Sequence, residues 1–595
     1  METEEPRNAP TPDRPIGLLA NEARFGSDAV ADALRAVDIP FIALNPGASF
    51  RGLHDSLVNY LGNERPAMLL CLHEEHAVAI AHGWAKVTGR AIAAAVHSNV
   101  GLMHATMAVF NAWCDRMPVL LIGATGPVDP ERRRPWIDWI HTARDQGALV
   151  RGYTKWDDQP ASPAAARESI VRAKWVAETA PQGPVYVNLD AGMQEAPIAA
   201  PLPPLEAARL APAVRAAPDP DLLRRAAETL ARAKRPIILA GRVSRSLEAW
   251  QQRIALAEAL GARVISDLKL AAAFPTDHPL HAGAPAVWPD AEATAALQKA
   301  DVLLSLDWVD LAGTLKAAFG SGTSSATIIQ ATLEHRPHSG WSMDSQALPP
   351  VDVLLAAEPD VAVAALVDTL GGNRSDPRPA RPRPFATSLV PSGPLNVAHL
   401  AHGLRHTVAG REVSLTHLPL SWDGAFWPFR HPLDYLGSEG GAGIGSGPGI
   451  SVGAALALRG RDRLPIGICG DGDFVMGATA VWTAARYRIP LLIVVANNRS
   501  FYNDEVHQER MARLRGRPVE NKWIGQRIAD PDIDIAGLAR AQGAQGFGPI
   551  ANGKDLIAAL EAAIAAVDAG AVAVVDVRVE PGYTPAMAAA VARSN

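Results

Sequence analysis

The sequence predicts an α/β protein with three consecutive domains, each built on a parallel sheet. Short apolar runs alternate with longer amphipathic stretches along the whole chain, which is typical of buried strands joined by crossover helices. Two Pro-rich stretches, residues 196–220 and 372–394, show neither helical nor alternating periodicity and are predicted to be linkers. Although 595 residues would allow about four domains of ordinary size, the two linkers divide the chain into three.

The expected strands and helices follow in chain order. In the first segment, residues 21–195, apolar runs predict strands at 40–44, 68–72, 91–96, 119–122 and 185–189. The second segment, residues 221–371, has such runs at 236–239, 263–265, 302–306 and 327–330, and the third, residues 395–580, at 464–469, 490–495 and 573–577. Stretches such as 27–36 and 77–87 predict helices between them. Residues 1–20 are expected to be a flexible N-terminus and residues 581–595 a C-terminal tail.

Composition excludes several classes of protein. Apolar residues make up 48% and charged residues 20% of the chain, the usual mix for a globular protein. The net charge of −6 gives no electrostatic reason to expect nucleic acid or an anionic membrane as a partner. Three cysteines are too few for a disulfide framework or a Cys-rich zinc site. No secretory leader and no apolar run of transmembrane length is evident, so a cytoplasmic location is expected.

The strongest chemical motif is in the third segment. The run 464–469 leads into Gly470-Asp471-Gly472-Asp473, and Asn497-Asn498 ends the next apolar run. Parallel strands joined by a right-handed crossover bring both ends to the sheet edge where open α/β sheets bind ligands. Asp471 and Asn498 are therefore expected to converge as oxygen ligands of Mg²⁺, while Gly470 and Gly472 let backbone approach phosphates closely. Either piece alone also fits an ordinary strand-end turn.

This pair of motifs resembles the cofactor signature of thiamine-diphosphate (ThDP) enzymes. The resemblance implies that Asp471, Asn498 and the backbone carbonyl of Ser500 hold Mg²⁺, which bridges to the cofactor's diphosphate. Asp473 departs from the family, which usually has Ser or Ala there. A second carboxylate would repel the diphosphate unless it points away, so only the backbone N–H of Asp473 is expected to contact the cofactor.

The first segment carries a second part of the resemblance. His73-Glu74-Glu75-His76, followed by Gly83-Trp84-Ala85, is similar to the family pattern in which a Glu bonds the cofactor's aminopyrimidine ring. Alignment on Gly-Trp-Ala selects Glu74. The cofactor's thiazolium carbon must lose a proton, and the 4′-amino group accepts it once a carboxylate stabilises the imino tautomer. The alternatives are an acidic first helical turn that offsets the helix dipole and a zinc site, whose usual spacing is His-Glu-x-x-His.

A third stretch resembles one branch of the family, the benzoylformate decarboxylases. His97-Ser98, Asn111-Ala112-Trp113 and Asn45-Pro46-Gly47 match it, and they imply that His97 donates or accepts a proton at the substrate. A lone His at a strand end is otherwise commonly structural. Ala48 replaces the Ser that contacts the substrate carboxylate in that branch. The branch's second active-site His has no clear counterpart after Leu306.

Further motifs complete the resemblance. Gly441–Gly445 with Pro448 is similar to the element that props the cofactor into its bent shape, which implies Ile444 as the prop and backbone contacts from Ala442 and Ile444 to the pyrimidine. Residues 501–510 stand where relatives often have a mobile cover; Glu505 and His507 could face it, but a solvated polar face is expected. The middle segment is similar to a central domain that binds FAD in some relatives, including acetolactate synthases, and no motif favours FAD here.

The resemblance implies pyrimidine-binding, central and diphosphate-binding domains, in that order. It implies an enzyme dependent on ThDP and Mg²⁺ that cleaves or forms a C–C bond next to a carbonyl, first of all by decarboxylating a 2-oxo acid. Carboligation of the acetolactate-synthase type, a 2-hydroxyacyl lyase and a non-catalytic cofactor-binding relative are the alternatives. The expected partners are a small 2-oxo acid or 2-hydroxy ketone and, because Glu74 of one subunit meets the diphosphate site of another in the family, a homodimer or homotetramer.

Overall fold

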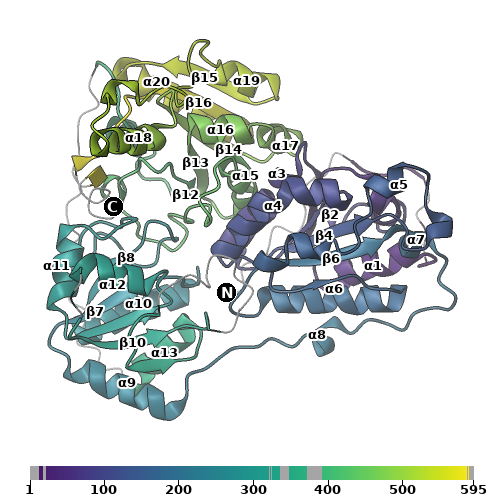
Figure 1. Ribbon diagram of the computed structural model, residues 1–595, viewed down its shortest axis with the longest axis horizontal. Helices are drawn as coiled ribbons and strands as arrows, with labels where there is room; N and C mark the ends of the chain where they lie inside the picture. Colours follow the sequence, from purple (N-terminus) through teal and green to yellow (C-terminus); the bar gives the residue numbers. More distant parts are fainter. Residues whose placement is uncertain are drawn as a thin grey trace.

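A computed structural model of the chain describes residues 13–17, 20, 22–320, 322, 324–335, 348–371, 392–585 and 587–588. Three α/β lobes surround the centre of the molecule (Figure 1), and each holds one parallel sheet covered by helices. We call them the N-terminal, central and C-terminal domains. Most of the stretch 372–394, which the sequence predicts as a linker, lies outside the described residues, as do residues 1–12 of the N-terminus and 589–595 of the tail.

The N-terminal domain has a six-stranded sheet in the order β2-β1-β3-β4-β6-β5. Its strands are β1 (Phe41–Leu44), β2 (Ala67–Leu70), β3 (Ala93–Ala95), β4 (Leu120–Thr125), β5 (Asp157–Asp158) and β6 (Val185–Asp190). Its helices are α1 (Gly26–Ala36), α2 (Arg51–Asp55), α3 (Glu74–Thr88), α4 (Ser98–Cys114), α5 (Ile137–Ile140), α6 (Pro163–Glu178) and α7 (Ala191–Glu195). The strands β1, β3 and β4 are buried throughout, which is why they read as apolar runs without alternation.

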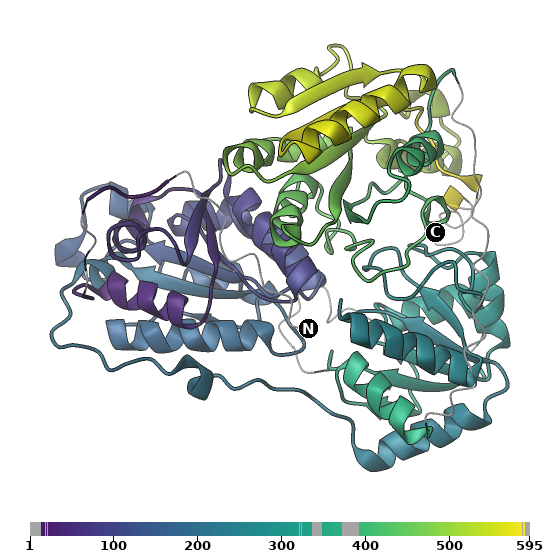
Figure 2. The same ribbon diagram turned by 180° about the vertical axis from the view of Figure 1, so that it is seen from behind.

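The central domain has a five-stranded sheet in the order β11-β10-β9-β7-β8. It comprises β7 (Pro236–Ala240), β8 (Arg263–Ser266), β9 (Val302–Leu306), β10 (Thr327–Ala331) and β11 (Val353–Leu355), with helices α9 (Pro220–Arg232), α10 (Leu247–Leu260), α11 (Ala291–Lys299), α12 (Leu311–Phe319) and α13 (Pro359–Thr369). Between it and the N-terminal domain the chain runs in a long, mostly extended stretch that holds only the short helix α8 (Ala207–Leu210), as the view from behind also shows (Figure 2).

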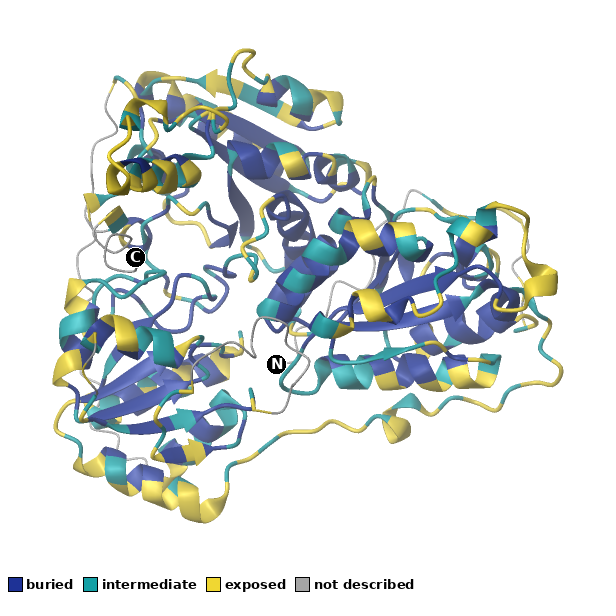
Figure 3. Ribbon diagram, viewed as in Figure 1, coloured by how far each residue is buried: buried dark blue, intermediate teal, exposed yellow. Residues whose placement is uncertain are grey.

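The C-terminal domain has a five-stranded sheet in the order β12-β13-β14-β16-β15. Its strands are β12 (Val413–His417), β13 (Leu464–Gly470), β14 (Leu491–Asn497), β15 (Gln545–Ile550) and β16 (Val572–Arg578). Its helices are α14 (Val397–Thr407), α15 (Gly447–Leu458), α16 (Asp471–Gly477), α17 (Ala480–Arg486), α18 (Tyr502–Leu514), α19 (Ile535–Ala541) and α20 (Gly553–Asp568). Colouring by burial shows its inner strands buried among these helices (Figure 3).

The N-terminal and C-terminal domains share one hydrophobic core. Its buried side chains come from α3 and α4 on one side and from α15 and α17 on the other. The helices α3 and α15 cross at glycines: a Cβ on Gly83 would lie 2.0 Å from the carbonyl oxygen of Ile450, and one on Gly453 would lie 1.9 Å from that of Ile80. Gly83 of the Gly-Trp-Ala motif is thus required by helix packing. This crossing fixes the beginning of α3 next to the C-terminal domain.

Four strands are absent from the sequence-based expectation, and all four are short or polar. β5 is two aspartates, β11 has three residues, and β12 has polar residues at alternate positions. β15 is largely exposed at the sheet edge and contains Gly and Pro, so it carries no apolar run. Where it describes the chain, the structure contains no helix with both the length and the apolar character needed to cross a bilayer.

Candidate active site

The candidate metal ligands lie together at the carboxyl edge of the C-terminal sheet. β13 and β14 pair in parallel with Gly470 opposite Ala496, so Asp471 and Asn497 occupy neighbouring positions where the two strands end. Asn497 is buried, and its amide donates to a buried carboxylate on β16. Asn498 is the member of the pair that lies half-buried at the edge. The register therefore brings Asp471 and Asn498 to one place.

Asp471 has an environment that suits a cation ligand. Its side chain is buried, and Oδ2 has no hydrogen-bond partner among the described residues. Burial raises the pKa of Asp471 to about 6, while backbone N–H groups of Asp471 itself, Gly472, Ser500 and Arg499 act to lower it. These groups place Asp471 beside the turn that carries Ser500. A buried carboxylate oxygen without a donor, close to an amide side chain, fits Mg²⁺.

The two glycines of the motif have different surroundings. A Cβ on Gly472 would lie 2.6 Å from the ring of Phe501, so packing against the following segment requires glycine there. A Cβ on Gly470 would meet nothing within 4 Å. The protein itself therefore leaves space above Gly470, where a phosphate could approach the backbone.

Asp473 is bonded to the glycine-rich loop. Its Oδ1 accepts hydrogen bonds from Gly445 N at 2.7 Å and from Gly447 N at 3.3 Å. The side chain is 7% exposed, and Oδ2 lies 3.7 Å from His417 Nδ1. The carboxylate is thus turned toward the loop, which avoids the repulsion that a second acidic side chain beside a diphosphate would cause.

The glycine-rich loop is also fixed by the N-terminal domain. The Asn111 amide on α4 donates from Nδ2 to the carbonyl of Gly443 at 3.1 Å and accepts at Oδ1 from Gly443 N at 3.3 Å. Gly443 lies between Ala442 and Ile444, the two residues expected to meet the pyrimidine. Ala442 is exposed and has a φ of 57°, and Ile444 is 41% exposed. Two motifs distant in the sequence therefore form one clamp.

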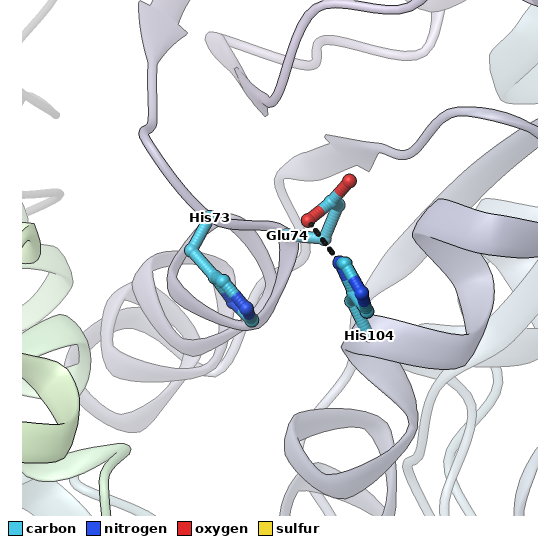
Figure 4. A group of neighbouring side chains, drawn as sticks. All are labelled: His73, Glu74 and His104. Atoms are coloured by element: carbon cyan, nitrogen blue, oxygen red, sulfur yellow. Dashed lines mark hydrogen bonds and ion pairs between the residues drawn. The ribbon is translucent and has the colours of Figure 1, made fainter.

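Glu74 is the first residue of α3, at the end of the segment that follows β2. It is 8% exposed, and its Oε2 lies 3.1 Å from Nδ1 of His104 on α4 (Figure 4). The rings of His73 and His104 stack with centroids 5.2 Å apart. The neighbouring Glu75 serves a different contact, because its Oε1 accepts from Ser446 Oγ at 3.2 Å. Burial raises the pKa of Glu75.

His97 precedes α4 and is held by Ser49. Its Nδ1 lies 2.9 Å from Ser49 Oγ and 3.4 Å from Ser49 N, while Ser49 Oγ accepts from Ser98 N at 3.2 Å. This donor pattern assigns the lone pair to Nδ1 and the proton to Nε2. Burial, then His141, whose ring lies 4.7 Å away edge-on, lowers the pKa of His97, so the ring is neutral near pH 7.

The segment after Asn498 corrects one expectation. Residues 501–510 are largely within α18, and His507 is exposed, in agreement with a solvated face. Glu505, however, is 3% exposed. Its Oε1 accepts from Ser500 Oγ at 2.5 Å and lies 3.7 Å from Arg527 Nε. Glu505 is therefore a buried support of the turn at Ser500, since helix α18 packs this face inward.

Three family models match the chain in order. They are the N-terminal TPP binding domain (residues 24–149), the central domain (residues 223–332) and the C-terminal TPP binding domain (residues 420–577) of thiamine pyrophosphate enzymes. The chain belongs to the thiamine pyrophosphate enzyme family. Its cofactor is ThDP, and the three parallel-sheet domains match those of the family, as the sequence predicts.

Members of the family resemble the chain over most of its length. Benzoylformate decarboxylase of Pseudomonas aeruginosa is 27% identical, with 84% of this chain and 89% of that protein aligned. A probable acetolactate synthase large subunit of Methanocaldococcus jannaschii is 23% identical over 80% of each chain. The structure of a ThDP-dependent 4-hydroxybenzoylformate decarboxylase from Rhodococcus jostii RHA1 superposes with a TM-score of 0.74 at 24% identity, covering 94% of this chain and 99% of that one.

The central domain of this ThDP enzyme gives no support to FAD. A cavity of about 1480 Å³ lies at the carboxyl ends of β7, β9 and β10, next to the end of α4. Arg242, after β7, is already paired with Glu334 at 3.0 Å and with Asp307 at 3.6 Å. Glu334 also accepts two hydrogen bonds from Arg116 of the N-terminal domain. These ion pairs join the two domains across the end of the sheet.

Several residues around the ThDP site carry no signal in the sequence. Ser49 stands one residue after Ala48, so a motif match by position misses it. His141 follows the short helix α5 and meets His97 only through folding. The sequence assigns no function to His104, and it is the packing of α3 against α4 that brings His104 next to Glu74. His417 ends a strand that the sequence does not indicate.

Proposed function

We propose that this protein is a Mg²⁺-dependent ThDP enzyme that decarboxylates a small 2-oxo acid. The observation that carries the proposal is the arrangement of His97, whose Nδ1 is occupied by Ser49 so that Nε2–H is available to a substrate. The relationship to benzoylformate decarboxylase over 84% of the chain supports the same reaction class. Bound ThDP would supply a carbon nucleophile for the 2-oxo group and accept the electron pair released with CO₂.

In this proposal Mg²⁺ is held by Asp471, Asn498 and the backbone carbonyl of Ser500. The unpaired Oδ2 of Asp471 and the half-buried amide of Asn498 support the first two ligands. The N–H of Asp473 and the backbone of Gly470 and Gly472 would face the diphosphate, and the open space lies above Gly470. Neutral and charged oxygen donors of this kind leave positions for phosphate oxygens in the Mg²⁺ shell.

Glu74 and the glycine-rich loop act on the other end of the cofactor. Glu74 would hydrogen-bond N1′ of the pyrimidine and favour the imino tautomer, and the burial of Glu74 would keep water from competing for that bond. Ala442 and Ile444 are exposed and carried by a clamped loop, as residues that contact a bound ring need to be. His97 Nε2–H would donate to the substrate oxygen or to the product carbon, while Ser49 holds the ring in place through its contacts with Nδ1.

We also propose that a second copy of the chain completes the site. Apolar side chains near the candidate residues are exposed: Leu72 is 47% exposed, Met103 54%, Ile444 41% and Met476 57%. Leu72 and Met103 lie near Glu74 and His104 in the chain. Ile444 belongs to the glycine-rich loop, and Met476 lies beside that loop. A homodimer or homotetramer that covers both groups would exclude water from the reaction.

A cytoplasmic location stays a prediction from the sequence.

The test is turnover of a panel of 2-oxo acids by the apoprotein, with and without ThDP and Mg²⁺, with CO₂ release and mass spectrometry of the products. Release of CO₂ and the matching aldehyde from at least one aromatic or aliphatic acid, only with both ThDP and Mg²⁺, is expected. A panel that yields no CO₂ with the loaded protein would contradict decarboxylation. Products that join two substrates would favour carboligation, the reaction named for the acetolactate synthase relative.

A further inference from the structure

Residues 438–447 include the glycine-rich loop described above, and we call this segment the cofactor loop. A buried group of charged side chains lies behind it. It consists of His417 at the end of β12, Asp473 in the first turn of α16, and Glu439 within the loop. His417 is 4% exposed and Asp473 7%, and the Glu439 side chain is 14% exposed. The reaction proposed above assigns no function to these three side chains.

His417 is an imidazolium by its contacts. Nδ1 lies 3.0 Å from the carbonyl oxygen of Ile468, and Nε2 lies 3.3 Å from Oε2 of Glu439. Both acceptors lack a proton to give, so both ring nitrogens must donate. Burial acts to lower the pKa of His417, but Asp473, and then Cys469 and Glu439, raise it well above its usual range.

A metal ion is the other occupant that this cluster suggests, and the contacts argue against it. Ligand atoms of His417, Cys469 and Asp473 lie within 4.8 Å of one another. However, Nδ1 of His417 has its proton directed at the Ile468 carbonyl and offers no lone pair.

The imidazolium of His417 is linked to the cofactor loop by the carboxylates of Asp473 and Glu439. Asp473 accepts the N–H groups of Gly445 and Gly447, at the end of the loop that leads into α15. Glu439 belongs to the beginning of the loop, where the preceding carbonyl of Ser438 also accepts from Lys86 Nζ at 2.7 Å. Between these two fixed points lie Ala442 and Ile444.

We propose that His417 is a positioning residue: as the cation between Asp473 and Glu439, it holds the cofactor loop in the shape that presents Ala442 and Ile444 to the pyrimidine of ThDP. The inference rests on the proposed function, because it concerns the same cofactor site. It also gives Asp473 a role, because its carboxylate joins the loop amides to the buried cation.

Removing the cation alone is expected to disturb the loop more than removing the pair. His417→Gln removes the cation that lies between the two carboxylates, so their charges are no longer offset at that point. In the double variant His417→Gln with Asp473→Asn, the Asn oxygen still accepts from the glycine amides and one buried charge of each sign is gone. His281→Gln is the matched control, because His281 is fully buried in the central domain with both ring nitrogens bonded, to Ser266 and Gly283.

The experiment measures ThDP affinity of the full-length apoprotein by calorimetry at saturating Mg²⁺, kcat at saturating ThDP, and amide hydrogen exchange of peptides covering residues 440–450 without cofactor. For His417→Gln we expect a Kd for ThDP at least tenfold higher, a kcat within about threefold of the wild type, and exchange at least tenfold faster. The double variant is expected to return both Kd and exchange to within about threefold of the wild type, and His281→Gln to change neither.

A double variant no better than His417→Gln, or loop exchange unchanged in His417→Gln, would overturn the proposal. If His417→Gln does not fold, Asp473→Ala takes its place, since it removes the acceptor of both glycine amides. Faster exchange over residues 440–450 is then expected, and unchanged exchange would be the contrary result. A wild-type protein that binds no ThDP would refute the proposed function. The hydrogen-exchange measurement needs no cofactor, so it would still show whether His417 holds the loop in place.

Discussion

We expect the protein to lose stability on acidification because of His76, which lies on the buried face of α3. It is 3% exposed, and its Nδ1 lies 2.9 Å from Oγ1 of Thr479 in the C-terminal domain. Burial, and then His73, lowers the pKa of His76 from its usual value of about 6.5 to about 4. Between these two values the unfolded chain binds a proton that the folded chain excludes, so acidification favours unfolding. The contribution is absent above the unfolded pKa and grows as pH falls toward the folded pKa.

The size of the effect follows from the two pKa values. One pKa unit corresponds to about 1.4 kcal/mol, and at about pH 5 the folded form is still almost wholly unprotonated. His76 therefore removes about 2 kcal/mol of stability between about pH 8 and about pH 5. His76→Gln keeps a group that can bond Thr479 but cannot titrate, so the variant is expected to lose about 2 kcal/mol less over this interval.

The assay is urea unfolding at the two pH values, followed by tryptophan fluorescence, to which Trp84 and Trp113 contribute from the core shared by the two domains. The exposed His507→Gln is the control and should follow the wild type. Equal losses of unfolding free energy in the wild type and His76→Gln would refute the argument, because every other titrating group is common to both.

Three further predictions concern the site and its support. Asn111→Ala removes both hydrogen bonds to Gly443, so calorimetry should show ThDP bound about tenfold or more weakly, and an unchanged Kd would contradict the clamp. His97→Ala should lower kcat by roughly 10²–10⁴, and Ser49→Ala by a smaller factor, because the latter only releases Nδ1; a larger loss in Ser49→Ala would argue against the assigned tautomer. Gly453→Ala places a methyl group 1.9 Å from the Ile80 carbonyl, so urea unfolding should show a loss of about 3 kcal/mol or more, and wild-type stability would mean that the helices separate without cost.

Much of the fold was predictable because buried parallel strands are apolar throughout. β9 was expected with its observed bounds, and β13 and β14 within a residue or two of each end. The position of Asp471 beside Asn498 followed from strand order and crossover handedness alone. The strands that the sequence did not indicate are edge strands or short ones: β5 and β11 have two and three residues, β12 carries buried polar side chains, and β15 contains Gly and Pro.

The support of the site could not be predicted because it depends on tertiary contacts, both within and between domains. Ser49 and His97 are far apart in sequence, and the helix crossing of α3 with α15 decides which acidic residue of the His73–His76 motif faces Ser446. Glu505 was expected on a solvated face because its neighbours are polar, whereas it is buried against Ser500. Asp473 seemed unfavourable beside a diphosphate until its two glycine donors were located.

The proposed function requires that Glu74 activates ThDP while the carboxyl edge of the C-terminal sheet holds it. The most direct measurement compares Glu74→Ala with the wild type in two assays on the same protein: Kd for ThDP with Mg²⁺, and CO₂ release from the best 2-oxo acid. Glu74→Ala is expected to fold, to bind Mg²⁺ and ThDP with largely retained affinity, and to lose turnover by at least about 10²-fold. Full turnover in Glu74→Ala would contradict the claim.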